Sequence, residues 1–242
     1  MDSGFYAACT GLAAQTQALD IIAENLANTS TAAYKARQST FQTILAQSQL
    51  SSAPVLNQAV NNYSILGSTP QIWTQGNLER TGNELDFALE GTGLFAVQTA
   101  SGVRYTRDGN FKVSAKGQLV TSNGDPVLGE NGPIPITPGT VSASTDGTIS
   151  INGALVGRLR LASFSPQDLV PAGAGYYSSS AQPASAPGTL VRQGMLEGSN
   201  INPVQATVQL ITVQRHAEML QRALSEFHGE FNKIAANDLP RL

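Results

Sequence analysis

The chain has 242 residues, of which 41% are hydrophobic and 13% are charged. This length allows one large domain or two small ones, and the charged share is about half of the usual one. The net charge of −3 provides no positive field for a phosphate backbone, so the composition argues against a nucleic-acid-binding protein.

The first predicted element is a helix from about residue 3 to residue 27. Apolar side chains recur every seven residues along it, with one more at an intermediate position: Phe5, Leu12, Leu19, Leu26 and Ile22. A seven-residue apolar repeat favours packing against a second helix. Two core helices of an ordinary globular fold would give the same pattern, so the repeat alone leaves both alternatives open.

The stretch ENLANTSTAAYKA, residues 24–36, ends this helix in amide and hydroxyl side chains. Asn28 is the expected end, because asparagine tolerates a left-handed cap. Asn25 and the hydroxyls are expected to bond backbone groups freed at that end, or polar groups of another subunit. An aromatic residue and a base, Tyr34 and Lys35, follow. A capped helix end packed within a single monomer is the alternative.

The same N-terminal region carries no sign of a targeting segment. The sequence begins MDSGFYAACTGL, with an acid at position 2 and no long apolar core, so a cleavable signal peptide is not expected. No run approaches the 18 or so apolar residues of a membrane span, and no membrane insertion is predicted. The single cysteine, Cys9, has no partner for an internal disulfide.

Glycine and proline divide the rest of the chain. Most of the 23 glycines lie between Gly67 and Gly198, which indicates a middle region full of turns. We therefore predict an N-terminal helical part at residues 1–47 and an extended linker, rich in Ser, Asn and Gln, at residues 48–75. A β domain at residues 76–195 is predicted to follow.

The β domain is predicted from short alternating segments. Residues 94–98 form one expected strand, and VRYTRDGNFKV, residues 103–113, alternates around Asp108-Gly109, a hairpin signal. Asn152-Gly153 predicts a second hairpin. Turn signals recur without an intervening helical pattern, which indicates an antiparallel sheet, sandwich or barrel.

The last predicted part, residues 196–242, contains a helix from about 203 to 236. Asn202 is its expected cap, with Pro203 in the first helical position. Apolar residues then follow in steps of three and four, as in a heptad seam: Leu210, Val213, Ala217, Leu220, Leu224, Phe227, Phe231 and Ile234. The predicted fold class is α+β, with a discontinuous, coiled-coil-like helical domain from both termini and a central all-β domain.

Nucleotide, metal and thiol chemistry have little support. GTGLFA, residues 91–96, fits a relaxed dinucleotide fingerprint, but we expect a strand after it where that mechanism needs a helix. His216 and His228 lie on different faces of the last predicted helix, without acids or cysteine at ligand spacing. We therefore predict no cofactor and no metal site.

One acidic pair leaves an enzymatic alternative open. Glu84 and Asp86 would lie on one face of a predicted strand. Glycosidases use a pair of carboxylates for catalysis. We expect this face to be solvated, with no aromatic platform for a sugar beyond Trp73. A secreted, β-rich hydrolase of cell-wall glycan is therefore the weaker hypothesis, together with a secreted adhesin or tip protein.

Three stretches together resemble the axial proteins of the bacterial flagellum, the rod and hook group. They are ENLANTSTAAYKA, YTRDGNFKV and GMLEGSNINPVQATVQLITVQRHAEM, which occur in the family's order and span nearly the whole chain. VLGENGPIPI, VGRLRL and LEGSNIN are most similar to the proximal-rod member, whereas TRDGNF and the N-terminal segment are equally similar to the distal-rod member. Ala33 departs from the family, which usually has glycine there, and alanine disfavours a positive φ.

The resemblance implies a structural subunit rather than an enzyme. It implies polymerisation with copies of itself and other rod subunits into a hollow driveshaft that crosses the periplasm and transmits torque from motor to hook. A distal-rod subunit is the alternative. Further implied partners are hook–basal-body neighbours and the flagellar type III export apparatus, which would export the chain without a cleaved signal peptide to the basal body.

The resemblance also suggests which residues take part in subunit assembly. They are the two apolar seams and the polar residues beside them: Phe5, Leu12, Leu19, Ile22, Asn25, Leu26, Asn28, Tyr34, Asn200, Asn202, Leu210, Val213, Ala217, Leu220, Leu224, Phe227 and Phe231.

Overall fold

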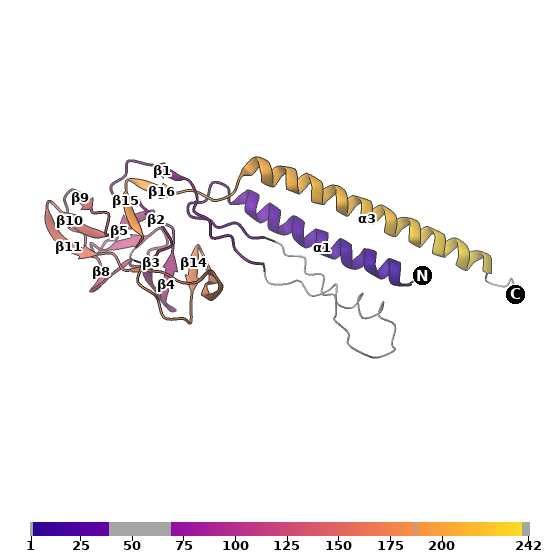
Figure 1. Cartoon of the computed structure of the whole chain (residues 1–242), viewed down its shortest axis with the longest axis horizontal. Coiled ribbons are helices and arrows are strands. Elements are labelled where there is room, and N and C mark those ends of the chain that lie inside the picture. Colours follow the sequence, from indigo (N-terminus) through magenta and orange to yellow (C-terminus); the bar gives the residue numbers. More distant parts are fainter. Residues whose placement is uncertain (1, 39–68, 187, 239–242) are drawn as a thin grey trace. The chain divides into compact units, whose positions relative to one another are not determined.

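A computed structural model describes residues 2–38, 69–186 and 188–238 of the chain (Figure 1). The chain forms two compact units. The helical unit contains the two terminal helices and adjoining residues, and the β unit contains residues 28–36 and 73–201. The predicted linker, 48–75, lies largely outside the described residues, so the predicted boundaries of the four parts stay predictions.

The helical unit consists of α1 (Asp2–Ala27) and α3 (Pro203–Asp238), which lie side by side and run antiparallel (Figure 1). Small side chains are prominent among the buried ones, with Ala18 in α1 and Ala206 and Ala217 in α3. A Cβ atom on Gly11 would lie 3.6 Å from Leu220 Cδ1, so the helices approach closely at this point. Neither helix, as far as its residues are described, is long and apolar enough to span a membrane.

Both helices begin or end within a residue of the predicted positions. α1 ends at Ala27, immediately before Asn28. The side-chain oxygen of Asn202 accepts the N–H groups of Val204 and Gln205, both at 3.1 Å, which confirms it as the cap of α3. The left-handed cap expected at Asn28 is wrong: the non-glycine residues with positive φ in the described chain are Ala33, Asn152 and Ala174.

The β unit is made of short antiparallel strands. Its largest sheet has the order β12-β3-β4-β14-β13, a second sheet has the order β11-β10-β9, and four two-stranded ladders pair β1 with β16, β2 with β15, β5 with β6, and β7 with β8. The bounds are β1 Leu78–Arg80, β2 Phe87–Glu90, β3 Leu94–Thr99, β4 Gly102–Thr106, β5 Phe111–Val113, β6 Leu119–Thr121, β7 Leu128–Gly129, β8 Gly132–Pro133, β9 Val141–Ala143, β10 Thr148–Ile151, β11 Ala154–Arg158, β12 Leu161–Ala162, β13 Val170–Gly173, β14 Tyr176–Ser178, β15 Leu190–Gln193 and β16 Met195–Glu197, with a 3-10 turn at Pro166–Asp168.

Strand β3 separates the two apolar clusters of this unit. Phe95 and Val97 point into the larger cluster, while Leu94 and Ala96 belong to the smaller one. Successive side chains of a strand point to opposite faces, so β3 is buried on both sides. The predicted strand at 94–98 is confirmed as β3, which lies second in the order of the five-stranded sheet.

The two predicted hairpins have different outcomes. Asn152-Gly153 connects β10 to β11, with φ values of 50° and 84° at the two turn residues, as a type I′ turn requires. The hairpin predicted at Asp108-Gly109 is wrong, because β4 pairs with β3 and β14, whereas β5 pairs with β6.

The reason lies in the packing of Gly109. Its carbonyl oxygen accepts the N–H of Phe87 at 3.0 Å, and a Cβ atom on Gly109 would overlap the Phe87 carbonyl oxygen. Glycine is present there because two backbones touch, which is the second common use of glycine besides a tight turn.

Substituting alanine at this contact tests that explanation. We expect Gly109→Ala to lower the free energy of unfolding by about 3 kcal/mol or more, because the two backbones must separate. Gly157→Ala is the matched control, since a Cβ atom there meets nothing within 4 Å. Urea unfolding of both variants measures the difference, and equal stabilities would contradict the proposed contact.

Candidate functional site

The polar stretch that follows α1 belongs to the β unit, where it lies beside residues 197–200. The Ala33 N–H donates to the Glu197 carbonyl oxygen at 2.7 Å, and the Asn200 N–H donates to the Tyr34 carbonyl oxygen at 3.3 Å. The segment that opens the β unit is therefore bonded to the segment that closes it.

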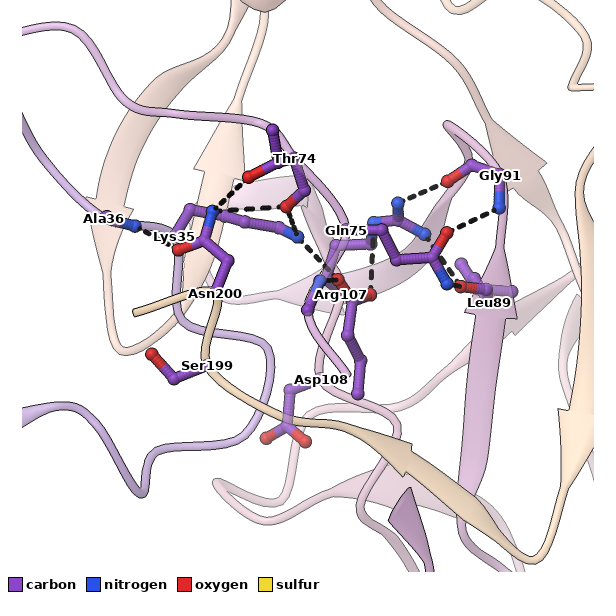
Figure 2. A network of polar contacts seen from close by, with 12 residues as sticks. Lys35, Ala36, Thr74, Gln75, Leu89, Gly91, Arg107, Asp108, Ser199 and Asn200 are labelled. Carbon is purple, nitrogen blue, oxygen red and sulfur yellow. Dashed lines mark hydrogen bonds and ion pairs between the residues drawn. The ribbon is translucent and has the colours of Figure 1, made fainter. Parts of the chain in front are cut away.

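Lys35 carries the positive charge of this stretch into the interior of the β unit. Its side chain is 0% exposed, and Nζ lies 2.5 Å from Glu197 Oε1. Nζ also donates to the Thr74 carbonyl oxygen at 2.9 Å, and Figure 2 shows the Lys35 side chain directed toward Thr74. Lysine is almost never fully buried unless it is paired, so the carboxylate of Glu197 accounts for its position.

The Glu197 carboxylate has a second cationic neighbour. Arg107 Nε lies 3.6 Å from Oε2, and the Gly76 N–H donates to Oε1 at 2.9 Å. Oε2 accepts no hydrogen bond from the described residues, so Arg107 is its electrostatic partner without being a hydrogen-bond donor to it. Lys35, Arg107 and Glu197 are called the Glu197 cluster below.

Arg107 is fixed from its other side by backbone carbonyls. Its guanidinium donates to the Leu89 carbonyl oxygen at 3.3 Å and to the Gly91 carbonyl oxygen (Figure 2). Both acceptors belong to β2 or to the turn that follows it. One cation of the Glu197 cluster is thus held by the core strands, whereas the other, Lys35, arrives on the segment next to α1.

Two buried cations surround one buried carboxylate. Burial lowers the pKa of Lys35, and the hydrogen bond and charge of Glu197 oppose that shift. Burial also lowers the pKa of Arg107, again against the charge of Glu197. A buried ion pair adds little net stability, but removing one partner costs about 3–5 kcal/mol, because the remaining charge stays buried. The cluster therefore strongly favours the one arrangement in which its three segments lie together.

Asn200 continues the attachment beyond the charges. Its side-chain oxygen accepts the Ala36 N–H at 2.8 Å, and its amide nitrogen donates to the carbonyl and hydroxyl oxygens of Thr74 at 3.2 and 3.1 Å (Figure 2). One side chain from the end of the β unit thus binds both earlier segments. Asn200 was predicted as an assembly residue, and in the structure these bonds lie within one chain.

A close approach of two backbones completes the arrangement. The Gly198 N–H donates to the Asn77 carbonyl oxygen at 2.8 Å, next to the β1–β16 ladder. A Cβ atom on Gly76 would overlap the Gly198 carbonyl oxygen. Only glycine at position 76 lets its N–H reach the Glu197 carboxylate while the two backbones touch.

Asn25 has a comparable role within the helical unit. Its amide nitrogen donates to the Arg37 carbonyl oxygen at 2.8 Å, and its oxygen accepts the Arg37 N–H at 2.9 Å. The Arg37 guanidinium pairs with Glu24 at 2.9 Å on the surface. Asn25 thus bonds the backbone of Arg37, which lies beyond the end of α1. The Asn28 side chain bonds the hydroxyl of Thr31.

The predicted seams lie at or beside the contact between α1 and α3. Ala217 is buried, and the following predicted residues are half-buried: Leu12, Leu19, Ile22, Leu26, Leu210, Val213, Leu220 and Leu224. Within α1, however, the most buried described side chains are Ala18 and Ile21. The contact with α3 therefore lies beside the predicted seven-residue apolar repeat. The side chains of Phe5, Phe227 and Phe231 lie outside the described residues.

Sequence reasoning did not select the Glu197 cluster. Lys35 was noted only as part of a motif, and Arg107 and Glu197 were not singled out. A signal was present, because Glu197 is the one acid between Gly194 and Asn202 in a chain with few charges. Pairing across such distances in sequence cannot be read from spacing, so the charges alone would not have shown the contact.

The other candidate chemistries receive no geometric support. GTGLFA leads into strand β3, not into a helix, and the Gly93 N–H is bonded by the Thr189 hydroxyl at 3.0 Å. His216 is exposed on α3, and the side chain of His228 lies outside the described residues. Within the described part of the chain, no three His, Cys, Asp or Glu side chains gather as a metal site would require.

The acidic pair does not form a solvated face. Asp86 is 4% exposed and accepts a hydrogen bond from the Asn83 amide at 3.0 Å, so the expectation for this residue is wrong. Asp86 is buried because it lies beside Asn110 in a β-bridge at the start of β2. Glu84 Oε2 accepts the Val141 N–H at 3.1 Å. Both carboxylates are engaged in holding local structure.

Comparison with known proteins matches three regions of the chain. Residues 5–35 match a flagella basal body rod protein model, residues 88–151 match the flagellar hook protein FlgE/F/G D1 domain, and residues 192–229 match the C-terminal domain of the flagellar basal body rod FlgEFG proteins. The flagellar basal-body rod protein FlgF of Caulobacter vibrioides is 34% identical over 100% of both chains.

Other relatives have similar coverage. FlgF of Salmonella typhimurium is 32% identical, with 97% of this chain and 98% of the relative aligned. The rod protein FlgG of Buchnera aphidicola from Acyrthosiphon pisum is 33% identical, with 93% and 96% aligned. This chain belongs to the flagellar basal-body rod protein family. It is a structural subunit of the rod in the flagellar basal body.

The family regions and the Glu197 cluster coincide. Lys35 is the last residue of the first matched region, Arg107 lies within the second, and Glu197 lies within the third. Each part of this rod protein thus contributes one charge to a single buried site. The site is architectural, because it joins the three matched regions.

Ala33 provides a test of the local geometry. Its φ is 56°, a left-handed value that costs a residue with a Cβ atom about 1–2 kcal/mol. We expect Ala33→Gly to raise the free energy of unfolding by up to about 1 kcal/mol, after the loss of a buried methyl group. Ala32→Gly, at a position without positive φ, should lower it. Denaturant unfolding measures the free energy of unfolding of both variants. If Ala33→Gly is destabilised more than Ala32→Gly, the proposed backbone strain at Ala33 is contradicted.

Asp108, in the stretch YTRDGNFKV, allows a test by pH. Burial raises its pKa, partly offset by the hydrogen bond from the Asn110 N–H. A raised pKa in the folded state means that stability falls as pH rises from the unfolded pKa to the folded one. Asp108→Asn should therefore be more stable than the unchanged chain at neutral pH, and this gain should shrink as pH falls through the folded pKa.

Asp146 provides the control of opposite sign. Hydrogen bonds from the Thr148 N–H and hydroxyl lower its pKa. The stabilisation by the ionised Asp146 carboxylate is present above the pKa of the unfolded state, and it is lost as pH falls through the pKa of the folded state. Asp146→Asn should therefore be less stable than the unchanged chain at neutral pH. Urea midpoints between about pH 7 and pH 3 measure both variants. If both substitutions shift the urea midpoint at neutral pH in the same direction, the opposite pKa shifts of Asp108 and Asp146 are contradicted.

Proposed function

We propose that this rod protein polymerises with copies of itself and other rod subunits into the hollow shaft that crosses the periplasm and transmits torque from motor to hook. We further propose that it is a proximal-rod subunit, with a distal-rod subunit as the alternative. The family membership supports rod assembly, and the segments VLGENGPIPI and LEGSNIN support the proximal assignment.

The observation that carries assembly is an exposed apolar stripe on α3. Val204, Val208, Ile211 and Met219 are 72%, 58%, 46% and 57% exposed. Their spacing of four, three and eight residues places them on one face of a helix. The predicted seam residues of α3 with described side chains are buried or half-buried, so this second stripe is the apolar surface of α3 that is left for another subunit.

We propose that the helical unit of an adjacent rod subunit covers this stripe. Residues 203–214 contain no charged side chain, so two such surfaces approach without electrostatic repulsion. The absence of Lys and Arg in this segment also gives it no attraction for anionic lipid or nucleic acid. We propose that the steps of three and four in α3 give the α1–α3 pair a coiled-coil-like packing.

Export remains a proposal that rests on the resemblance. We propose that the flagellar type III apparatus exports the chain without cleavage of a signal peptide, and that hook–basal-body neighbours contact it after export. The residues predicted to assemble subunits, including the two seams, stay proposals in that role.

Replacing two stripe residues tests the proposed surface. We expect the double variant Val208→Gln and Ile211→Gln to abolish or strongly reduce motility, because the apolar contact with the adjacent subunit is lost. Helix content by circular dichroism should not change, since both side chains are exposed and surface substitutions alter stability by about 0.5 kcal/mol or less. Motility is scored in a strain that lacks the natural chain.

The matched control replaces exposed apolar residues of the β unit. Leu155 and Val170 are 74% and 59% exposed, and their double replacement by Gln should leave motility intact. Normal motility of the α3 variant would contradict the proposed surface. Electron microscopy of basal bodies from a strain lacking the chain separates the two rod assignments. A rod that stops near the inner membrane supports the proximal one, and a rod that stops further out supports the distal one.

A further inference from the structure

The attachment of residues 28–36 to the β unit depends on few positions. The Ala33 N–H reaches the Glu197 carbonyl oxygen, the Lys35 ammonium reaches the Glu197 carboxylate, and the Ala36 N–H reaches the Asn200 side chain. The Asn200 N–H also donates to the Tyr34 carbonyl oxygen, so each of the four residues 33–36 has a polar contact with the segment 197–200. This segment is separated from Lys35 by 162 positions in sequence.

The receiving segment belongs to neither of the two larger sheets. Glu197 ends β16, which pairs only with β1 among the described strands, and the two form a ladder of their own. Thr74 and Gly76, which complete the site, lie just before β1. The two apolar clusters, by contrast, are built from residues between 85 and 191 together with Trp73. Polar contacts hold the first set of segments, and apolar burial holds the second.

The charges allow residues 28–36 to separate from the other segments without leaving an unpaired charge behind. Arg107 is fixed by the carbonyls of Leu89 and Gly91, so it stays with the apolar clusters. If Lys35 leaves, Glu197 keeps Arg107 as a partner, and the pair that remains has no net charge. If Glu197 loses its charge, two buried cations remain without an anion, and the more weakly held one, Lys35, is the one that must leave.

We propose that the Glu197 cluster is a conformational latch, which releases residues 28–36 from the β unit while the two apolar clusters stay folded. The latch closes only when the segment 195–200 is in place, so a chain that lacks its C-terminal part has a folded β core and an unattached N-terminal segment. This inference does not depend on the proposed place in the rod.

Hydrogen exchange of the full chain tests the latch. In Glu197→Gln, we expect exchange of the Ala33, Ala36 and Gly76 amides to accelerate by about 100-fold or more, because their acceptors lie in the latch. The Ala96, Gln98 and Val127 amides, which bond within the β core, should keep their rates. Glu79→Gln is the matched control: Glu79 is exposed on β1, beside the latch, and the rates of all six amides should stay unchanged.

Two results would overturn the proposal. Equal acceleration of all six amides means that the Glu197 carboxylate supports the whole unit, and unchanged rates at Ala33 and Ala36 mean that the carboxylate does not hold the segment. If Glu197→Gln does not fold, exchange of the unchanged chain in rising urea gives the answer. Ala33, Ala36 and Gly76 should then share one opening free energy that lies below that of Ala96, Gln98 and Val127. A single value for all six contradicts the latch.

Discussion

The attachment of the two ends of the chain to the apolar core of the β unit depends on one buried carboxylate placed between two buried cations. Glu197 receives Lys35 on one oxygen and Arg107 beside the other, and these three residues come from the beginning, middle and end of the chain. A charge in the protein interior is tolerated only when partners surround it, so Lys35 can occupy its buried position only while Glu197 is in place. In this rod protein, the interaction joins residues 28–36, which follow α1, to residues 197–200, which precede α3.

Local signals predicted much of the fold. The apolar steps and the cap at Asn202 gave the start of α3, the end of α1 was placed within a residue, and Asn152-Gly153 gave a correct hairpin. These features depend on residues close in sequence, where backbone geometry and side-chain bonding act together. The class of the protein, two terminal helices and a strand-rich middle, followed from the same periodicities.

The remaining features depend on contacts between distant segments. Asp108-Gly109 resembles a hairpin turn, but Gly109 is required by the backbone of Phe87, which lies against it. Asp86 alternates like a surface residue and is buried. The Glu197 cluster was missed for the same reason, since a single acid in LEGSN does not reveal a lysine 162 positions away. The spacing of residues in sequence indicates the local structure of one segment, whereas its contacts with distant segments depend on tertiary packing.

The common attachment of the two ends also has a consequence for how much the β unit can vary. The chain enters the unit through residues 28–36 and 73–77 and leaves it through 195–201, and the β1–β16 ladder and Asn200 tie these passages together. Apart from Arg107 and the backbone that holds it, the stretch between Arg80 and Met195 is therefore a cassette whose entrance and exit are joined outside it. Lengthening a turn inside this cassette adds a loop-closure cost that grows only slowly with length. Natural or engineered insertions there would change the surface of the β unit without breaking the ladder that joins its entrance to its exit.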